Sequence, residues 1–184
     1  MRESTFINVF QQAADKILNN TIVVKSKSNL LYELYLNDKL EISERDLKNP
    51  RRGYSAFQTD ICVYEQINNV LIPRIAIEFK TKITTHDILT YSAKAGKHKS
   101  IYPSLRYGLI ASELDSIPPR FFIHNEHIDF FIAAKKYKTD RLTEFIDKLI
   151  KDEITASKEL EKLYLNKGKF DYYRSTFTMS NFYH

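Results

Sequence analysis

The sequence predicts an α/β fold of the α+β type, in which a mixed central sheet is flanked by helices. Two observations lead to this prediction. Apolar residues recur at helical spacing near the start of the chain and again after residue 139, whereas the middle alternates β-branched or aromatic residues with polar ones. With 184 residues, 4 glycines and 5 prolines, the chain has the length of one domain and no long flexible linker.

The composition is that of a folded globular protein. Lys and Arg total 28 and Asp and Glu total 23, so the formal net charge is +5, a modest excess that is compatible with a polyanionic partner. The single cysteine, Cys62, excludes a disulfide framework and a cysteine-based zinc cluster, and we expect it to be a buried thiol. No apolar run reaches the roughly 18 residues of a membrane-spanning helix, and the polar N-terminus has no signal-peptide stretch. We therefore expect a soluble cytoplasmic protein with no membrane partner.

The N-terminal third of the chain predicts two helices and one short strand. Apolar residues are spaced by three or four positions in two stretches, and Ser4 or Thr5 is placed to cap the first. In chain order we expect a helix over 5–19, a strand over 21–25, a second helix over 28–37 and a loop through most of 38–53.

The middle of the chain predicts a β-hairpin. The segments 58–65 and 74–82 are rich in β-branched and aromatic residues, and Asn68-Asn69 between them is a turn signal. Downstream we expect a helix over 86–100, which Thr84 or Thr85 caps and Pro103 stops. A strand over 106–111, a strand pair over 121–123 and 128–134, and a long helix from 139 should follow. The aromatic tail over 170–184 is expected to pack on the core or to offer a surface to a partner.

The predicted hairpin brings three charged residues to one face of the sheet. If it is centred on Asn69, Asp60 lies opposite Glu78, since each is nine positions from the centre, and Lys80 lies one step along the same face. Two adjacent carboxylates repel each other unless they share a proton, a cation or a metal. Mg²⁺ is bound through one or two carboxylates plus water and phosphate oxygens. The pattern therefore indicates metal-assisted phosphodiester hydrolysis, with Lys80 acting on the attacking water or the developing charge. A solvated charged face is the structural alternative.

The segments Gln58-Thr59-Asp60-Ile61 and Ile75-Ala76-Ile77-Glu78-Phe79-Lys80 resemble the active-site signature of the PD-(D/E)XK nuclease superfamily, which has the restriction-endonuclease-like fold. In that signature an Asp opens one strand, Glu-x-Lys lies on the next, and a helix and a further strand follow. The resemblance covers about residues 28–134, within a single domain over 1–184 that ends in a helical and aromatic extension over 139–184.

This resemblance implies Mg²⁺ as the cofactor, double-stranded DNA as the substrate, and products with a 5′-phosphate and a 3′-hydroxyl. It also implies that Asp60 and Glu78 are metal ligands and that Lys80 is the catalytic lysine. Thr59 departs from the pattern, which has Pro at this position. Many members carry a further acid on the first core helix, for which Glu33 is the candidate here.

Five basic residues near the predicted site are candidates for contact with DNA phosphates. A solvated protein surface is the alternative for each of them, and Tyr91 is expected either to point into the site or to pack on the core. The candidates are Arg51, Arg52, Lys82, Lys94 and Lys97.

The sequence contains no recognisable DNA-reading module. More narrowly, it resembles the small catalytic subunits of heterodimeric type IIS restriction endonucleases, which implies a larger partner subunit that recognises the DNA. A homodimer that reads a palindrome, a repair or junction-resolving nuclease, and a non-catalytic nuclease-like binding module are the alternatives.

Overall fold

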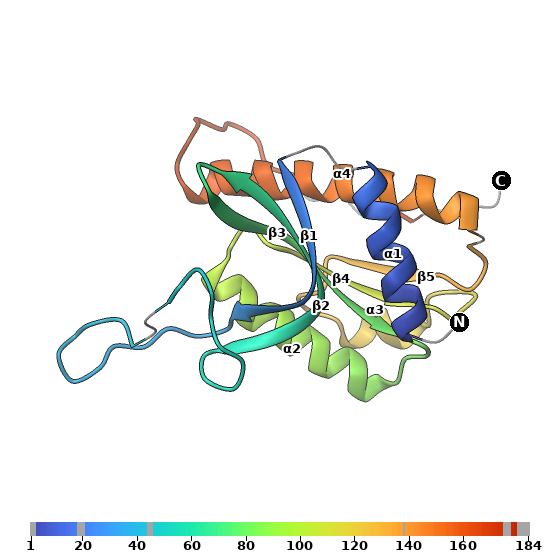
Figure 1. The fold of residues 1–184 in the computed structure, drawn as a ribbon, viewed down its shortest axis with the longest axis horizontal. Helices are drawn as coiled ribbons and strands as arrows, with labels where there is room; N and C mark the ends of the chain where they lie inside the picture. The colour runs from blue at the N-terminus through green and yellow to red at the C-terminus, as the bar shows by residue number, and fades with distance from the viewer. Residues whose placement is uncertain (1–2, 18–20, 44–45, 138, 175–177, 180–184) are drawn as a thin grey trace.

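The computed structural model describes residues 3–17, 21–43, 46–137, 139–174 and 178–179. Five strands form one mixed sheet in the order β1-β2-β3-β4-β5, with helices on both faces (Figure 1), which confirms the predicted fold class. The elements are α1 (Glu3–Ile17), β1 (Ile22–Leu31), β2 (Ala56–Ile67), β3 (Val70–Lys80), α2 (Thr85–Ile101), β4 (Arg106–Ala111), α3 (Pro119–His124), β5 (Phe130–Ala133) and α4 (Thr139–Tyr164). Strands β1 to β3 are antiparallel, whereas β3, β4 and β5 are parallel. Within the described ranges no helix is both long and apolar enough to cross a membrane.

The core has two layers, one on each face of the sheet. Successive side chains of a strand point to opposite faces, so neighbours in β2 and β3 enter different layers. Ile61 and Val63 of β2 and Ile75, Ile77 and Phe79 of β3 pack under α1 and α4, whereas their even-numbered neighbours Cys62, Tyr64 and Ala76 pack under α2 and α3. The first layer includes Phe10, Ile61, Val63, Ile75, Ile77, Phe79 and Ile146, and the second includes Cys62, Ala76, Ile88, Ala95, Tyr107, Leu109 and Phe121. Asp60, Glu78 and Lys80 are even-numbered and belong to the α2 face.

The hairpin between β2 and β3 turns at Asn68-Asn69, as predicted. Both asparagines have positive φ, 49° and 63°, which suits a tight two-residue turn whose twist matches the strands. Next to the turn the ladder pairs residues whose numbers sum to 137, such as Glu65 with Ile72. Beyond a β-bulge at Val63 and Tyr64 the sum is 138. At the bulge Arg74 is the one residue of β3 with no residue opposite it on β2, and the register of the hairpin shifts by one position.

Helix α2 begins where the sequence predicts. Thr84 is its N-cap, with its hydroxyl accepting from the Asp87 N–H at 3.2 Å, while the Asp87 carboxylate accepts from the Thr84 N–H at 2.8 Å. This capping box fixes the angle at which the chain leaves β3 and enters the helix. Because α2 follows Lys80 so closely, it lies directly over the face of the sheet that carries the three charged residues.

Two predicted elements are wrong. The region 28–37 is not helical, because β1 continues to Leu31, where Leu30 and Leu31 pair with Phe57 and Ala56 and are buried. Its apolar spacing suits a helix, but tertiary pairing with β2 overrides that preference. Residues 121–123 form part of the short helix α3 rather than a strand, since Pro118-Pro119 starts a helical turn.

Smaller differences lie at the two ends of the chain. The proposed caps Ser4 and Thr5 lie inside α1. The aromatic tail does not pack on the core where it is described, since Phe170, Tyr172 and Tyr173 are 51–77% exposed. Phe177, Phe182 and Tyr183, on which the same prediction rested, lie outside the described residues.

A finger, defined here as residues 32–43 and 46–55, projects from the end of β1 and returns to β2 (Figure 1). Its root is fixed by Tyr32, whose N–H donates to the Ser55 carbonyl at 2.8 Å and whose ring stacks on Phe57 at 3.9 Å. Near its tip, the Asn37 side chain accepts from two backbone N–H groups, and Leu40 is 79% exposed. Because β2 begins at the finger's root, the finger leaves the sheet at the same end as Asp60.

Candidate active site

Asp60 enters the site from β2 and is tied to the backbone of β3. Its Oδ2 accepts a hydrogen bond of 2.8 Å from the N–H of Phe79. The β2–β3 ladder reaches Ile61 opposite Ile77, and one further step in this register places Asp60 opposite Glu78. The expected pairing of these two carboxylates agrees with that register.

Glu78 is the buried member of the pair, with 3% of its surface exposed. Its Oε1 accepts from the Tyr107 hydroxyl at 2.7 Å and from the Lys94 ammonium at 2.5 Å. Burial raises the pKa of Glu78 to about 7, and the charge of Asp60 adds to that rise, whereas Lys94 and Tyr107 oppose it. Burial thus disfavours the charged form of Glu78 unless a cation or hydrogen-bond donor compensates it.

Lys94 reaches Glu78 from helix α2, which covers this face of the sheet. Its ammonium also donates to the Gln58 carbonyl at 2.6 Å, and only 16% of its side chain is exposed. Sequence reasoning placed Lys94 on a basic helix surface and missed its contact with Glu78. A signal was present, because Lys94 falls within the stripe of α2 that contains Tyr91, Ala95 and His98, which pack toward the sheet.

Lys80 lies at the end of β3, half-buried beside Tyr91. The Lys80 ammonium lies 5.6 Å from the centre of the Tyr91 ring, and the Lys94 ammonium lies 5.9 Å from the same ring. Burial raises the pKa of Tyr91 to about 12, with the negative charge of Glu78 contributing in the same direction. Tyr91 therefore stays protonated beside the two cations, and it also packs against the core on the α2 face, so the two alternatives expected for it are both met.

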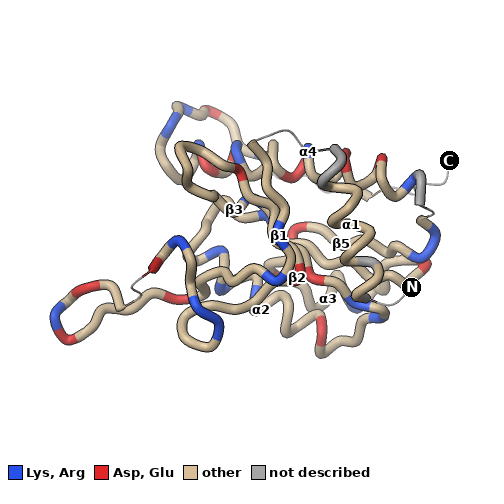
Figure 2. The backbone as a smooth tube through the Cα atoms, in the orientation of Figure 1, with Lys and Arg blue, Asp and Glu red and all other residues tan. Residues whose placement is uncertain are grey.

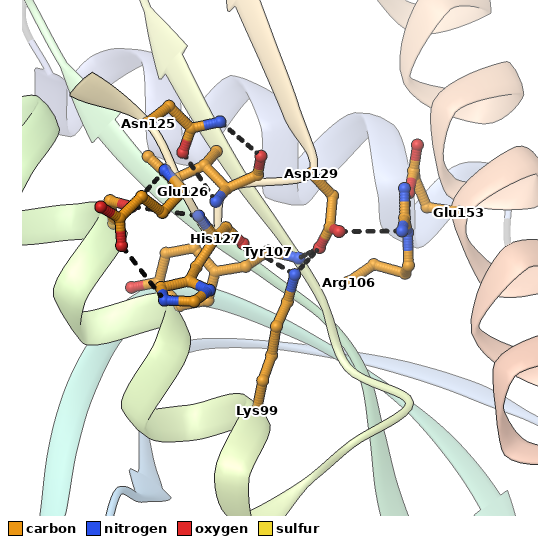
Figure 3. A network of polar contacts seen from close by, with 10 residues as sticks. Lys99, Arg106, Tyr107, Asn125, Glu126, His127, Asp129 and Glu153 are labelled. Atoms are coloured by element: carbon orange, nitrogen blue, oxygen red, sulfur yellow. Dashed lines mark hydrogen bonds and ion pairs between the residues drawn. The ribbon is translucent and has the colours of Figure 1, made fainter. Parts of the chain in front are cut away.

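A second network of polar contacts holds the backbone of Tyr107, whose hydroxyl bonds Glu78 (Figure 3 shows the network). The N–H of Tyr107 donates to Asp129 Oδ2 at 2.6 Å. Asp129 also forms ion pairs with Lys99 at 2.7 Å and with Arg106 at 2.9 Å, and Arg106 continues to Glu153 of α4 at 2.7 Å. These contacts join α2, β4, the segment before β5 and α4. They fix the strand from which the Tyr107 hydroxyl reaches Glu78.

The other basic candidates lie around the site rather than in it. Arg51 and Arg52 are exposed at the root of the finger, and Lys82 is exposed just beyond β3. Lys97 is exposed on α2, where it lines a separate groove of about 570 Å³ with His124 and His127. Basic and acidic positions are interspersed along the described part of the chain (Figure 2).

Glu33 does not lie on a core helix, so the prediction that it adds an acid to the site from such a helix is wrong. That prediction depended on a helix over 28–37, and Glu33 instead lies in the finger, just beyond the end of β1. The candidate acids of the site are therefore Asp60 and Glu78.

The donor set suits a hard divalent cation. Hydrogen bonds with described residues use one oxygen of each carboxylate, Oδ2 of Asp60 and Oε1 of Glu78. Across the described ranges the side chains of His, Cys, Asp and Glu form no cluster of three or more that would hold a metal ion. Two carboxylates are enough for Mg²⁺, which keeps several waters, whereas zinc usually takes three or four protein ligands.

Comparison of the sequence with known proteins identifies no relative. No protein-family model matches the sequence, and no curated protein is significantly similar to it.

Proposed function

We propose that this protein is a Mg²⁺-dependent DNA endonuclease in which Asp60 and Glu78 bind the metal and Lys80 acts on the reacting groups. The observation that carries the proposal is the hairpin. Its register, continued one step past the last pair of Ile61 with Ile77, sets Asp60 opposite Glu78, and a hydrogen bond from Phe79 ties Asp60 to the Glu-x-Lys segment. A solvated surface hairpin would leave such charges exposed. Here Glu78 is buried beneath α2 instead.

The order of elements around the site supports the same proposal. The Asp lies on β2 and Glu-x-Lys on the adjacent antiparallel strand β3, and α2 and the parallel strand β4 follow. This is the arrangement implied by the resemblance to the restriction-endonuclease-like fold. It brings the start of β2 and the ends of β3 and β4 together at one edge of the sheet.

The chain's own residues have separate parts in this proposal. When bound, Mg²⁺ supplies charge stabilisation at a phosphoryl oxygen and lowers the pKa of a bound water. Asp60 and Glu78 orient the cation, and Tyr107 fixes the carboxylate of Glu78. Lys80, on the same face as Glu78, orients the attacking water or stabilises the negative charge that develops on the phosphate.

We further propose that a second chain directs this site to DNA. A larger recognition subunit is the first candidate, and a second copy of the protein is the alternative. The described residues form one sheet with its covering helices, which leaves no separate DNA-reading domain among them. The finger supports a role in assembly because it is internally hydrogen-bonded and yet exposes Leu36, Leu40 and Ile42 to solvent.

A non-catalytic binding module is the second candidate function, and one observation favours it. Lys94 already satisfies Glu78 as a cation partner, so the buried carboxylate is compensated by the protein itself. Under this candidate, Asp60 and Glu78 would be structural charges and the protein would not hydrolyse DNA.

Cleavage of supercoiled plasmid DNA tests the proposal. The wild type is incubated with Mg²⁺ or with EDTA, alone and with a candidate larger subunit, beside a Lys80→Met variant. We expect cleavage only with Mg²⁺, its loss in Lys80→Met, and products that carry a 5′-phosphate and a 3′-hydroxyl. Cleavage that persists in EDTA or in the variant would overturn the proposed site, and a lack of cleavage in every mixture would favour the binding module.

A further inference from the structure

Lys94 differs from a surface lysine that is available to contact DNA, because its ammonium is already bonded within the protein. Its ammonium is bonded to two oxygens at once, Glu78 Oε1 at 2.5 Å and the Gln58 carbonyl at 2.6 Å. An ionised carboxylate as buried as Glu78 is costly unless a cation or hydrogen-bond donors compensate it. Lys94 supplies that compensation, together with the Tyr107 hydroxyl.

We propose that Lys94 is the resident counter-cation of this site and that it leaves Glu78 when a divalent cation binds to Asp60 and Glu78. The inference rests on the proposed function, because it requires the metal site. It adds a residue of α2 to the residues that control metal loading, and it gives Lys94 a role distinct from the surface contact with DNA expected from the sequence.

Electrostatics favours exchange over coexistence. A Mg²⁺ ion binds carboxylate oxygens at about 2.1 Å, so an ammonium kept on the same carboxylate would lie only a few ångströms from it. Repulsion between two cations is strong in a buried site, where solvent screens it little. The long flexible side chain of lysine allows its ammonium to move without a shift of α2.

The second contact of Lys94 determines where the ammonium goes. Gln58 is two residues before Asp60 on β2, and its carbonyl oxygen remains a hydrogen-bond acceptor after Glu78 has been released. The displaced ammonium therefore stays at the edge of the site. There it adds a positive charge beside the metal ligands, where an anionic phosphate would enter.

Lys99 provides a matched internal control on the same helix. Like Lys94, it is bonded to one carboxylate and one backbone carbonyl, Asp129 at 2.7 Å and His127 at 2.7 Å, and its side chain is 24% exposed. It lies in the network of Figure 3, not among the candidate metal ligands. A change confined to Lys94 is thus distinguishable from a general loosening of α2.

The first measurement is acetylation of the DNA-free protein by a low concentration of an amine-reactive acetyl ester, quantified for each lysine by mass spectrometry. Mg²⁺ binding is measured in parallel by calorimetry. We expect acetylation of Lys94 to rise several-fold with Mg²⁺, half-maximally at the Kd from calorimetry, while Lys99 does not change. In an Asp60→Asn variant both the binding heat and the rise at Lys94 should disappear.

A crystal structure with Mn²⁺, located by its anomalous signal, reads the geometry directly. We expect the ion between Asp60 and Glu78, with the Lys94 ammonium no longer bonded to Oε1. Asp60-dependent metal binding with Lys94 still bonded to Glu78 overturns the exchange and leaves the proposed nuclease site intact. The absence of Asp60-dependent metal binding overturns both the exchange and the metal site on which it rests.

Discussion

The backbone N–H of Phe79 donates a hydrogen bond of 2.8 Å to the carboxylate of Asp60. Phe79 is the residue between Glu78 and Lys80, and its own side chain is buried on the opposite face, edge-on to Phe10 at 5.5 Å. The bond extends the connection between β2 and β3 beyond their last paired residues. It holds the carboxylate of Asp60 on β2 against the backbone of β3, midway between Glu78 and Lys80.

This bond makes Asp60→Asn a clean test of charge. The amide oxygen of Asn can still accept from Phe79, so the hairpin should keep its geometry while the metal ligand is lost. We expect DNA cleavage to fall by about 100-fold or more. The thermal midpoint should stay the same or rise, since the charge of Asp60 no longer opposes ionisation of Glu78. Cleavage assays and thermal melting check the two parts.

Asp60→Ala is the complementary variant. It removes the charge and also the acceptor for the Phe79 N–H, so we expect the same loss of cleavage with a lower stability, by about 1–3 kcal/mol if that N–H stays unpaired. Equal stability of the Asn and Ala variants would show that the hydrogen bond does not hold the hairpin. Wild-type cleavage in the Asn variant would remove Asp60 from the proposed site.

Lys80 and Lys82 form a matched pair for testing the catalytic lysine. Both were candidates from the sequence, but Lys80 is half-buried beside Tyr91 whereas Lys82 is exposed beyond the end of β3. We expect Lys80→Met to lower the cleavage rate by about 100-fold or more at saturating DNA. Lys82→Met should act mainly on DNA affinity, with an effect that shrinks as the salt concentration rises. Rate measurements at several DNA and salt concentrations separate the two, and equal losses would contradict the assignment.

The hairpin could be predicted because its signals are local. Alternating residues mark both strands, and Asn68-Asn69 marks the turn. The register beyond the turn depends on a bulge that the sequence does not mark. A two-residue turn alone continues a pairing sum of 137, which would set Asp60 opposite Ile77, and the bulge at Arg74 changes the sum to 138. Centring the hairpin on Asn69 gave the sum of 138 that the ladder has between Val63 and Ile61, without identifying the bulge that produces it.

The partners of Glu78 could not be predicted in the same way. Lys94 and Tyr107 come from α2 and β4, and their contacts with Glu78 depend on how these elements pack over the sheet. Packing also decides the region 28–37, whose apolar spacing indicates a helix. There the backbone pairs with β2 up to Leu31 and then enters the finger. The local sequence pattern therefore identifies Asp60, Glu78 and Lys80 as candidates, but it does not predict which side chains contact Glu78.

Arg74 has a structural role that follows from the bulge. Its side chain is 1% exposed and bonds Glu65 on β2 and Glu161 on α4, each at 2.8 Å. Removing Arg74 takes this partner from Glu161 and leaves Glu65 with Lys158 alone, at 2.5 Å. We therefore expect Arg74→Met to lower the free energy of unfolding by about 3 kcal/mol, the lower end for a broken buried ion pair. Urea unfolding monitored by circular dichroism gives this value.

The control for Arg74 is an exposed ion pair on the same helix. Lys162 pairs with Glu159 at 2.6 Å, and both side chains are about half exposed. Lys162→Met should cost only about 0–1 kcal/mol, since surface pairs contribute little. If the two variants had similar stability, the network around Arg74 would not anchor α4 to the sheet.

His98 should make the fold sensitive to mild acid. Its ring is buried between β1 and β4, Nδ1 lies 2.8 Å from the Leu31 carbonyl, and burial lowers the pKa of His98 to about 4 from a usual value of 6.5. Between these values the unfolded chain binds a proton that the folded protein excludes. Stability from His98 is therefore complete above pH 6.5 and is lost as the pH falls toward 4, by about 2 kcal/mol between pH 8 and pH 5.

An Asn at position 98 keeps a donor for the Leu31 carbonyl but does not titrate, so His98→Asn isolates this effect. The raised pKa of Glu78 has the opposite sign, because its stabilisation of the folded state is lost as the pH rises from 4.5 through about 7. That contribution is common to both proteins and cancels when they are compared. We expect the wild type to be more stable than the variant at pH 8, where the variant has lost ring packing, and the difference to shrink by about 2 kcal/mol at pH 5. Urea unfolding of both proteins at the two pH values measures it, and a difference that is independent of pH would mean that folding does not shift the pKa of His98.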